Sequence, residues 1–178
     1  MLFADLPGAM VETWSAADGT LVTIRPISAA DLSLEREFVD GLSSSTGYQR
    51  LMSGRRPSLD ELKRWTDVDP ERECALIATA GIGGAVRQIA VARYVREASG
   101  REAEFAVVIG DDWQGRGLGT RLLSALVGHA KRQGVRRLFG TTLSTNTAML
   151  ALAARLGFRR AAESRSATIT NLTLDMEQ

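Results

Sequence analysis

The stretch DDWQGRGLGTRLL, residues 111–123, has glycines at positions 115, 117 and 119, and leucines at helical spacing follow them. Glycines at the start of a helix let a ligand approach the backbone N–H groups closely, where the positive end of the helix dipole also lies. Such a helix N-terminus favours an anion, most often a phosphate. Because a plain turn into a helix needs only one glycine, the stretch predicts a phosphate-binding loop.

Two common phosphate-binding motifs do not match this loop. A P-loop, G-x-x-x-x-G-K-[ST], that begins at Gly110 would need Lys and Ser or Thr where Arg116 and Gly117 stand. A dinucleotide-binding motif, G-x-G-x-x-G, would need a third glycine at Thr120 and an acidic residue at the end of the next strand, and both are missing. The loop therefore belongs to another class of phosphate site.

The patterns on both sides of the loop predict a mixed α/β fold. Alternating apolar residues predict strands over 19–27, 74–81, 87–97, 101–110, 135–143 and 168–176. Helical spacing and capping residues predict helices over 29–42, 59–67, 117–133 and 146–158, with a short helix and a surface loop in 43–57. This order predicts a mostly antiparallel sheet of about six to seven strands, covered by helices on both faces. Residues 101–143 should form a strand, a helix and a second strand parallel to the first.

The composition is that of an ordinary globular chain. With 178 residues, 44% hydrophobic and 24% charged, residues 19–178 can form one domain with a real core, preceded by a loosely held extension over 1–18. The net charge of +1 argues against nucleic acid or an anionic membrane as a partner. No apolar run approaches the ~18 residues of a membrane span. The single cysteine, Cys74, excludes a disulfide within the chain, and the first residues make a poor signal peptide, so we expect a cytoplasmic protein.

A wider pattern does match the loop. Gln114, Gly117 and Gly119 form Q-x-x-G-x-G between a strand that contains Glu104 and an amphipathic helix, and Asn146 and LGF (156–158) follow. In this combination the chain resembles the GNAT superfamily of acyl-coenzyme A-dependent N-acetyltransferases, from VTIRPI (22–27) to LGF. The resemblance implies that acetyl-CoA binds with its pyrophosphate on the loop and its pantetheine arm between two splayed strands, 103–109 and 136–143. The cofactor-binding residues that it implies are Val107, Val108, Ile109, Gln114, Gly115, Arg116, Gly117, Leu118, Gly119, Thr120, Asn146 and Met149.

Glu104 is the candidate general base. An amine with a pKa of ~10.4 must lose a proton before it attacks a thioester. Alternation along AEFAVVI (103–109) places Glu104 on one face with Ala106 and Val108, and partial burial in this apolar strand would raise the pKa of its carboxylate. The resemblance points to the same strand position as the base. The alternative is an edge glutamate paired with an arginine such as Arg101.

The sequence identifies the other catalytic groups less completely than the base. By resemblance, backbone N–H groups of Val108 and its neighbours face the thioester carbonyl. Many family members have a tyrosine seven residues after the asparagine as the general acid, but that position here is Ala153. Either the thiolate leaves unassisted or another group helps it. Asn146 and Ser144 are candidates to contact the pantetheine arm, and Asn146 can also serve as a plain helix N-cap.

The remaining reactive side chains predict no further chemistry. We expect His129 on the protein surface and Cys74 in the core, whereas Trp113 can pack against either the cofactor or the core. With one histidine and one cysteine, neither a metal cluster nor a Cys–His pair is evident.

The acceptor is suggested by a narrower resemblance. Residues 22–52, 103–123 and 146–158 are similar to the catalytic domain of bacterial protein-lysine acetyltransferases, which modify metabolic proteins such as acyl-CoA synthetases. We expect Tyr48 and Arg50, with Arg55 and Arg56, at the lip of the acceptor cleft, where positive charge disfavours polyamines and suits acidic flanks. A small-molecule amine acetyltransferase and a non-catalytic acyl-CoA sensor stay open as alternatives. The acyl chain and the choice between monomer and homodimer stay open too.

Overall fold

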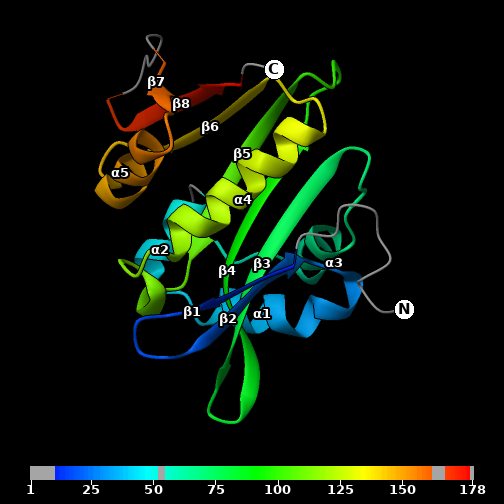
Figure 1. Cartoon of the computed structure of the whole chain (residues 1–178), viewed down its shortest axis with the longest axis vertical. Coiled ribbons are helices and arrows are strands. Elements are labelled where there is room, and N and C mark those ends of the chain that lie inside the picture. Colours follow the sequence, from blue (N-terminus) through cyan, green and yellow to red (C-terminus); the bar gives the residue numbers. More distant parts are fainter. Residues whose placement is uncertain (1–10, 52–54, 162–166, 177–178) are drawn as a thin grey trace.

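The computed structural model describes residues 11–51, 55–161 and 167–176, without the side chains of residues 48–51. In these ranges one sheet has eight strands in the order β1-β2-β3-β4-β5-β6-β8-β7 (Figure 1). All neighbouring strands are antiparallel except β5 and β6. The strands are β1 Glu12–Ser15, β2 Leu21–Pro26, β3 Glu73–Ile82, β4 Ala85–Arg96, β5 Glu102–Ile109, β6 Arg137–Leu143, β7 Arg159–Arg160 and β8 Ile169–Asp175. The predicted mixed, mostly antiparallel sheet is confirmed.

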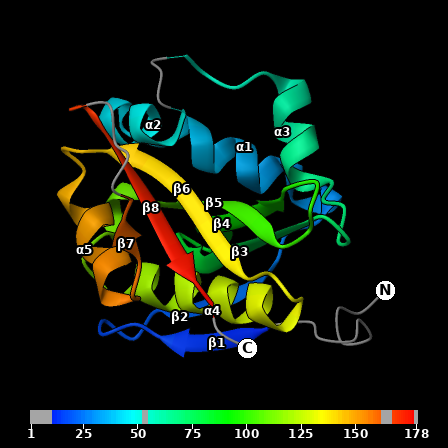
Figure 2. The same cartoon turned by 90° about the horizontal axis from the view of Figure 1, so that it is seen from above.

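Helices cover both faces of this sheet, as Figure 2 shows: α1, α2 and α3 lie on one side and α4 and α5 on the other. The α-helices are α1 Leu32–Asp40, α2 Ser44–Leu51, α3 Leu59–Thr66, α4 Leu118–Arg132 and α5 Thr147–Arg155, and the short 3-10 helices are η2 Ala29–Asp31 and η3 Asp111–Trp113. The larger core lies under α4, whose fully buried leucines at positions 118, 122, 123 and 126 form the predicted apolar stripe. None of the helices in these ranges combines the length and the apolar composition that crossing a bilayer requires.

Local sequence patterns predicted several boundaries of helices and strands correctly. Ser58 and Glu61 form the predicted capping box at the start of α3, with the Glu61 N–H donating to Ser58 Oγ at 3.2 Å. Gly83 and Gly84 both have positive φ, 60° and 80°, and form the two-residue turn between β3 and β4. These features depend on neighbours in sequence, so a pattern could reveal them.

Strand β1 was not predicted. Its four residues pair with β2 in a stretch that the sequence analysis assigned to the extension over 1–18. Arg121 of α4 stabilises it, because the guanidinium pairs with Glu12 at 2.7 Å and lies 5.0 Å from the centroid of the Trp14 ring. A strand this short has too little alternation to be recognised, and its partners come from the distant helix.

The parallel pair β5–β6 opens part-way along its length. The two strands pair at Glu102 with Arg137, Ala103 with Leu138 and Glu104 with Phe139, and this ladder does not continue toward Ile109 and Leu143. The predicted splayed pair is therefore present. The divergence begins beside Gly140, where a Cβ atom would lie 2.8 Å from the carbonyl oxygen and 2.9 Å from the ring of Phe105.

Gly140→Ala should therefore destabilise the fold. The added methyl group has backbone on one side and an aromatic ring on the other, so we expect a loss of about 1–3 kcal/mol in the free energy of unfolding. Gly128→Ala is the matched control, because a Cβ there meets only the end of the Arg132 side chain, at 3.5 Å, and alanine gains up to ~1 kcal/mol in a helix. Urea unfolding of both variants tests this, and an equally stable Gly140→Ala would contradict the close approach of the strands.

Candidate functional site

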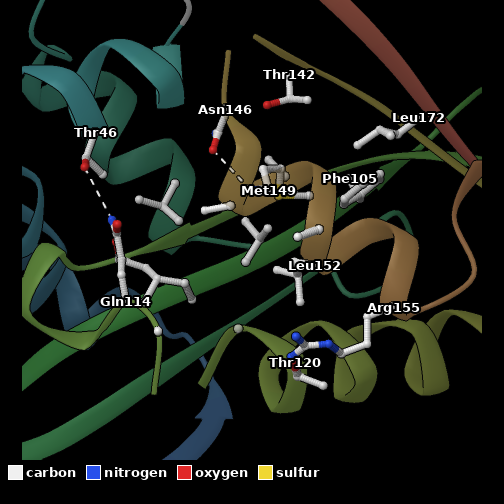
Figure 3. A pocket seen from close by; sticks show the side chains of 18 of the residues that line it. Thr46, Phe105, Gln114, Thr120, Thr142, Asn146, Met149, Leu152, Arg155 and Leu172 are labelled. Atoms are coloured by element: carbon white, nitrogen blue, oxygen red, sulfur yellow. Dashed lines mark hydrogen bonds between the residues drawn. The ribbon is translucent and has the colours of Figure 1, made fainter. Parts of the chain in front are cut away.

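A cavity of about 520 Å³ lies where β5 and β6 separate. Figure 3 shows residues from β5, β6, α2, α4 and α5 around it. All of the predicted cofactor-binding residues except Arg116 and Leu118 line it, namely Val107, Val108, Ile109, Gln114, Gly115, Gly117, Gly119, Thr120, Asn146 and Met149. The glycine-rich loop and the splayed strands thus share one cavity.

The side chains of Arg116 and Leu118 lie outside the cavity. Leu118 is completely buried in the core under α4. The Arg116 guanidinium lies 4.7 Å from the centroid of the Trp113 ring and pairs with Asp18 at 3.2 Å. Both side chains therefore hold the loop from outside the cavity.

The three glycines of the loop have two different physical roles. Gly115 and Gly117 have φ of 73° and 84°, a conformation that costs other residues about 1–2 kcal/mol, and Gly117 is the N-cap of α4. Gly119 is needed for close packing instead, because a Cβ there would lie 3.1 Å from Cδ2 of Leu152 in α5. The result is a helix N-terminus whose first N–H groups border the cavity without covering side chains.

The edge of β5 along the cavity directs backbone groups away from β4, and one of them, the Ile109 carbonyl, accepts a hydrogen bond from Nε2 of Gln114 at 3.1 Å. The N–H of Gly110 donates to the carbonyl of Ile89 on β4 at 2.8 Å, which sets the alternation of the antiparallel ladder. By that alternation Val107 and Ile109 direct their N–H and C=O groups toward the cavity, whereas those of Val108 face β4. The geometry thus favours the neighbours of Val108, and not Val108 itself, as donors to a ligand.

Glu104 borders the cavity but is exposed. The partial burial predicted for it is wrong, because described residues beside it on this face of the sheet are exposed as well. Ala106 on the same face is also exposed, and Val95, the cross-strand partner of Glu104, keeps 39% of its surface. Among the described residues no ion pair or hydrogen bond reaches the Glu104 carboxylate, and the alternative pairing with Arg101 is not formed. The carboxylate is therefore open to an incoming group.

The start of α5 contributes Asn146. Its Oδ1 accepts a hydrogen bond from the N–H of Met149 at 3.1 Å, so it caps the helix and borders the cavity at the same time. Ser144 lies beside the cavity lining without joining it, with its hydroxyl 2.9 Å from that of Thr170. Ala153 is fully buried in the core.

His129 is not on the surface, and the prediction that placed it there is wrong. It is half-buried on α4, with Nδ1 3.0 Å from the hydroxyl of Tyr94 on β4. Burial lowers the pKa of His129, and the positive charges of Arg132 and Arg96 add to this effect. Its partner comes from a distant strand, which the helical pattern could not show.

Cys74 and Trp113 both belong to the core. Burial raises the pKa of the Cys74 thiol to about 12, so it stays protonated and is no nucleophile. Trp113 is buried in the core, as one alternative predicted, and it also borders the cavity, so its packing against the cofactor stays a prediction. In the ranges given above, no three His, Cys, Asp or Glu side chains are grouped to hold a metal ion.

The cavity residues that the sequence analysis did not identify include Arg155 and Thr46. Arg155 of α5 is the one basic side chain in the described lining, and its Nη1 lies 3.4 Å from the hydroxyl of Thr120 on the first turn of α4. Its helical position looks like that of any surface arginine. Thr46 of α2 reaches the cavity through a contact with Asp111, 65 residues later, so no local signal could reveal it.

The structure describes the side chains of only two of the four residues predicted at the lip of the acceptor cleft, Arg55 and Arg56. The side chains of Tyr48 and Arg50 lie outside the described residues, although their backbone belongs to α2. Arg55 pairs with Glu61 at 2.8 Å, and Arg56 pairs with Asp40 at 3.4 Å. These two arginines are exposed and do not line the cavity.

Comparison with known proteins agrees with this geometry. The model of the acetyltransferase (GNAT) family matches residues 42–158, which include β5, β6 and all the helices that border the cavity. Acetyltransferase PA5475 of Pseudomonas aeruginosa is 33% identical over 145 residues, which cover 81% of this chain and 78% of the relative. Acetyltransferase Pat of Mycolicibacterium smegmatis is 37% identical over 135 residues, but these are 75% of this chain and only 40% of that protein. The GNAT domain of S. lividans PAT superposes with a TM-score of 0.85 at 28% identity and covers 97% of this chain and 100% of that domain.

Proposed function

Because this chain belongs to the GNAT family and is therefore an N-acetyltransferase that uses acetyl-CoA, we propose that it acetylates lysine side chains of proteins, with Glu104 as the general base. The observation that carries the proposal is the position of Glu104. Its carboxylate is exposed at the last residue pair of the β5–β6 ladder, where the cavity begins. A proton acceptor at that point is open to a nucleophile that arrives from solvent.

The residues around the cavity fit acetyl-CoA. The N–H groups of Val107 and Ile109 and the Val107 carbonyl point away from β4, so the amide groups of pantetheine can pair with them as a neighbouring strand would. The N-terminus of α4 and the nearby Arg155 guanidinium suit the phosphates. The cofactor supplies the acetyl thioester, and the protein supplies the backbone donors and the base.

Chemistry requires the lysine amine to be neutral. Removing its proton at pH 7 costs roughly 4–5 kcal/mol, given a pKa of ~10.4. Glu104 accepts that proton directly or through one water molecule. The N–H groups of Val107 and Ile109 donate to an oxygen on which negative charge develops. With alanine at position 153 in the core, the thiolate leaves without a tyrosine acid.

The open face around Glu104 favours a lysine on a protein over a small amine. Glu104, Ala106 and Val95 are all exposed, so the acceptor side is a surface and not a closed pocket. A side chain as long as lysine can reach from a protein surface to this carboxylate, whereas a small amine would find few walls to bind. We place the enzyme in the cytoplasm as part of the same proposal.

A thiol-release assay tests this function. Purified protein and acetyl-CoA are combined separately with an acyl-CoA synthetase, a peptide with one central lysine, spermidine and free amino acids. We expect free thiol, and acetyl on lysine Nζ by mass spectrometry, with the protein and the peptide. Faster release with spermidine or an amino acid would contradict the proposal and indicate a small-molecule acetyltransferase.

A further inference from the structure

One carboxylate holds the beginning of α2. Asp111, the first residue of η3, accepts hydrogen bonds from the N–H of Ser43 at 2.9 Å, the hydroxyl of Ser43 at 2.7 Å and the hydroxyl of Thr46 at 2.7 Å. The donors lie 68 and 65 residues earlier in the chain. This cluster of Asp111, Ser43 and Thr46 joins the end of β5 to a helix on the α1–α3 face of the sheet.

Helix α2 depends on such a contact because it is weak by itself. It has only eight residues, contains Gly47 and has no acidic residue in its first turn. Isolated helices of this length are marginal in water, and glycine costs about 1 kcal/mol relative to alanine. Ser44 and Ser45 are exposed, so burial adds little at this end. Ser43 caps the helix, with its Oγ accepting the N–H of Thr46 at 3.2 Å, and the Asp111 charge supplies from outside what the first turn lacks, a negative partner for the helix dipole.

The cluster also reaches the cofactor loop. Thr46 borders the cavity, and Nε2 of Gln114, the first residue of Q-x-x-G-x-G, lies 3.5 Å from its hydroxyl, as Figure 3 shows. The same nitrogen donates to the carbonyl of Ile109 at 3.1 Å. Helix α2 is thus linked through Thr46 and Gln114 to the cavity edge of β5. Figure 2 shows α2 on the same side of the sheet as α1, and Glu104 shares its face of β5 with Val108, which packs with Phe38 of α1.

We propose that Asp111 is a positioning residue that fixes α2 beside the acceptor side of the cavity and acts through Thr46. This inference rests on the proposed function and on the expectation from the sequence that Tyr48 and Arg50 of α2 contact the acceptor. Without the carboxylate, α2 loses its fixed position and acceptor binding weakens. Gln114 keeps its hydrogen bond to the Ile109 carbonyl, and Gly115 and Gly117 keep the conformation of the loop, so cofactor binding persists.

The charge of Asp111 is maintained at working pH. Burial alone would raise the pKa of this carboxyl group, but the hydrogen bonds from Ser43 and Thr46 outweigh burial and hold the pKa below its ordinary value. A carboxyl group whose pKa is lower in the folded protein than in the unfolded chain stabilises the fold. This stabilisation is fully present above the ordinary aspartate pKa, and it is lost as the pH falls through the lower pKa of the folded protein. The cluster is therefore intact at neutral pH, where the variants are compared.

Steady-state kinetics with the single-lysine peptide tests the inference. Asp111→Ala should raise the KM for the peptide about tenfold, since it removes hydrogen bonds to a charged group, and leave the Kd for acetyl-CoA within about twofold. Thr46→Val should change the peptide KM in the same direction, and Thr46→Ser, which keeps the hydroxyl, should restore it. Asp112→Asn is the matched control, because this adjacent exposed acid is outside the cluster. An unchanged peptide KM in Asp111→Ala, or an equal loss of cofactor affinity, would overturn the proposal.

Hydrogen–deuterium exchange supplies a readout that needs no acceptor. With acetyl-CoA present, amides of residues 44–51 should exchange faster in Asp111→Ala and Thr46→Val than in the wild type, while α4 and α5 stay protected. Unchanged exchange over 44–51 would refute the positioning role even if the acceptor is not lysine. Faster exchange in this segment without transfer to any acceptor would support the positioning of α2 and count against the proposed function alone.

Discussion

Glu104→Gln is expected to reduce turnover with the lysine peptide by about 10²–10⁴-fold and to leave the affinity for acetyl-CoA within about twofold of wild type. Glutamine keeps the size and the strand position but cannot take a proton from the amine. Since Glu104 is exposed and has no ion-pair partner among the described residues, the change should not unfold the protein. Initial rates of thiol release, with calorimetry for the cofactor, measure the two effects separately.

Glu102→Gln is the control for this result. Glu102 lies two residues earlier on the same face of β5, pairs with Arg137 at 3.1 Å and does not border the cavity. It should keep wild-type turnover, because an exposed ion pair contributes at most about 1 kcal/mol to stability. Equal turnover in Glu104→Gln and wild type would remove Glu104 from the role of base and leave a solvent molecule or another group in that role.

Gly117→Ala is expected to weaken acetyl-CoA binding about a hundredfold, or ~2.8 kcal/mol. Gly117 caps α4 with φ of 84°, and Gly117, Gly119 and Thr120 at the start of this helix line the cavity. A methyl group there meets no protein atom within 4 Å, so its effects are backbone strain and obstruction of the approach to the N–H groups at the start of this helix. Each hydrogen bond to a charged group is worth about 1.5–3 kcal/mol, which is the size of the expected loss.

Gly134→Ala separates strain from obstruction. Gly134 follows α4 at its other end with φ of 79°, and an added methyl group there would also meet no atom within 4 Å, so the cost of strain, about 1–2 kcal/mol, is the same. Both variants should lower the melting temperature to a similar degree, but only Gly117→Ala should lose cofactor affinity. Normal calorimetric binding by Gly117→Ala would exclude the loop as the phosphate site.

By itself, the sequence determined the features that depend on near neighbours. The helix N-terminus after Gly117, the Ser58–Glu61 capping box and the turn at Gly83 and Gly84 are set by residues within a few positions of one another. Alternation along β5 likewise placed Glu104 and Val108 on one face, because the direction of side chains in a strand has a period of two. These patterns sufficed to predict the mixed sheet and the glycine-rich side of the cavity.

Only the tertiary structure decided the features that depend on contacts between distant segments. Glu104 is exposed together with its neighbours Ala106 and Val95 on the same face of the sheet, and His129 is half-buried beside Tyr94 of another strand. Strand β1 contacts Arg121, more than a hundred residues away, and the start of α2 is held by Asp111, 65 residues after Thr46. The burial and the ion pairing of a residue depend on which distant segments contact it in the folded protein. The local periodicity of the sequence does not indicate these partners.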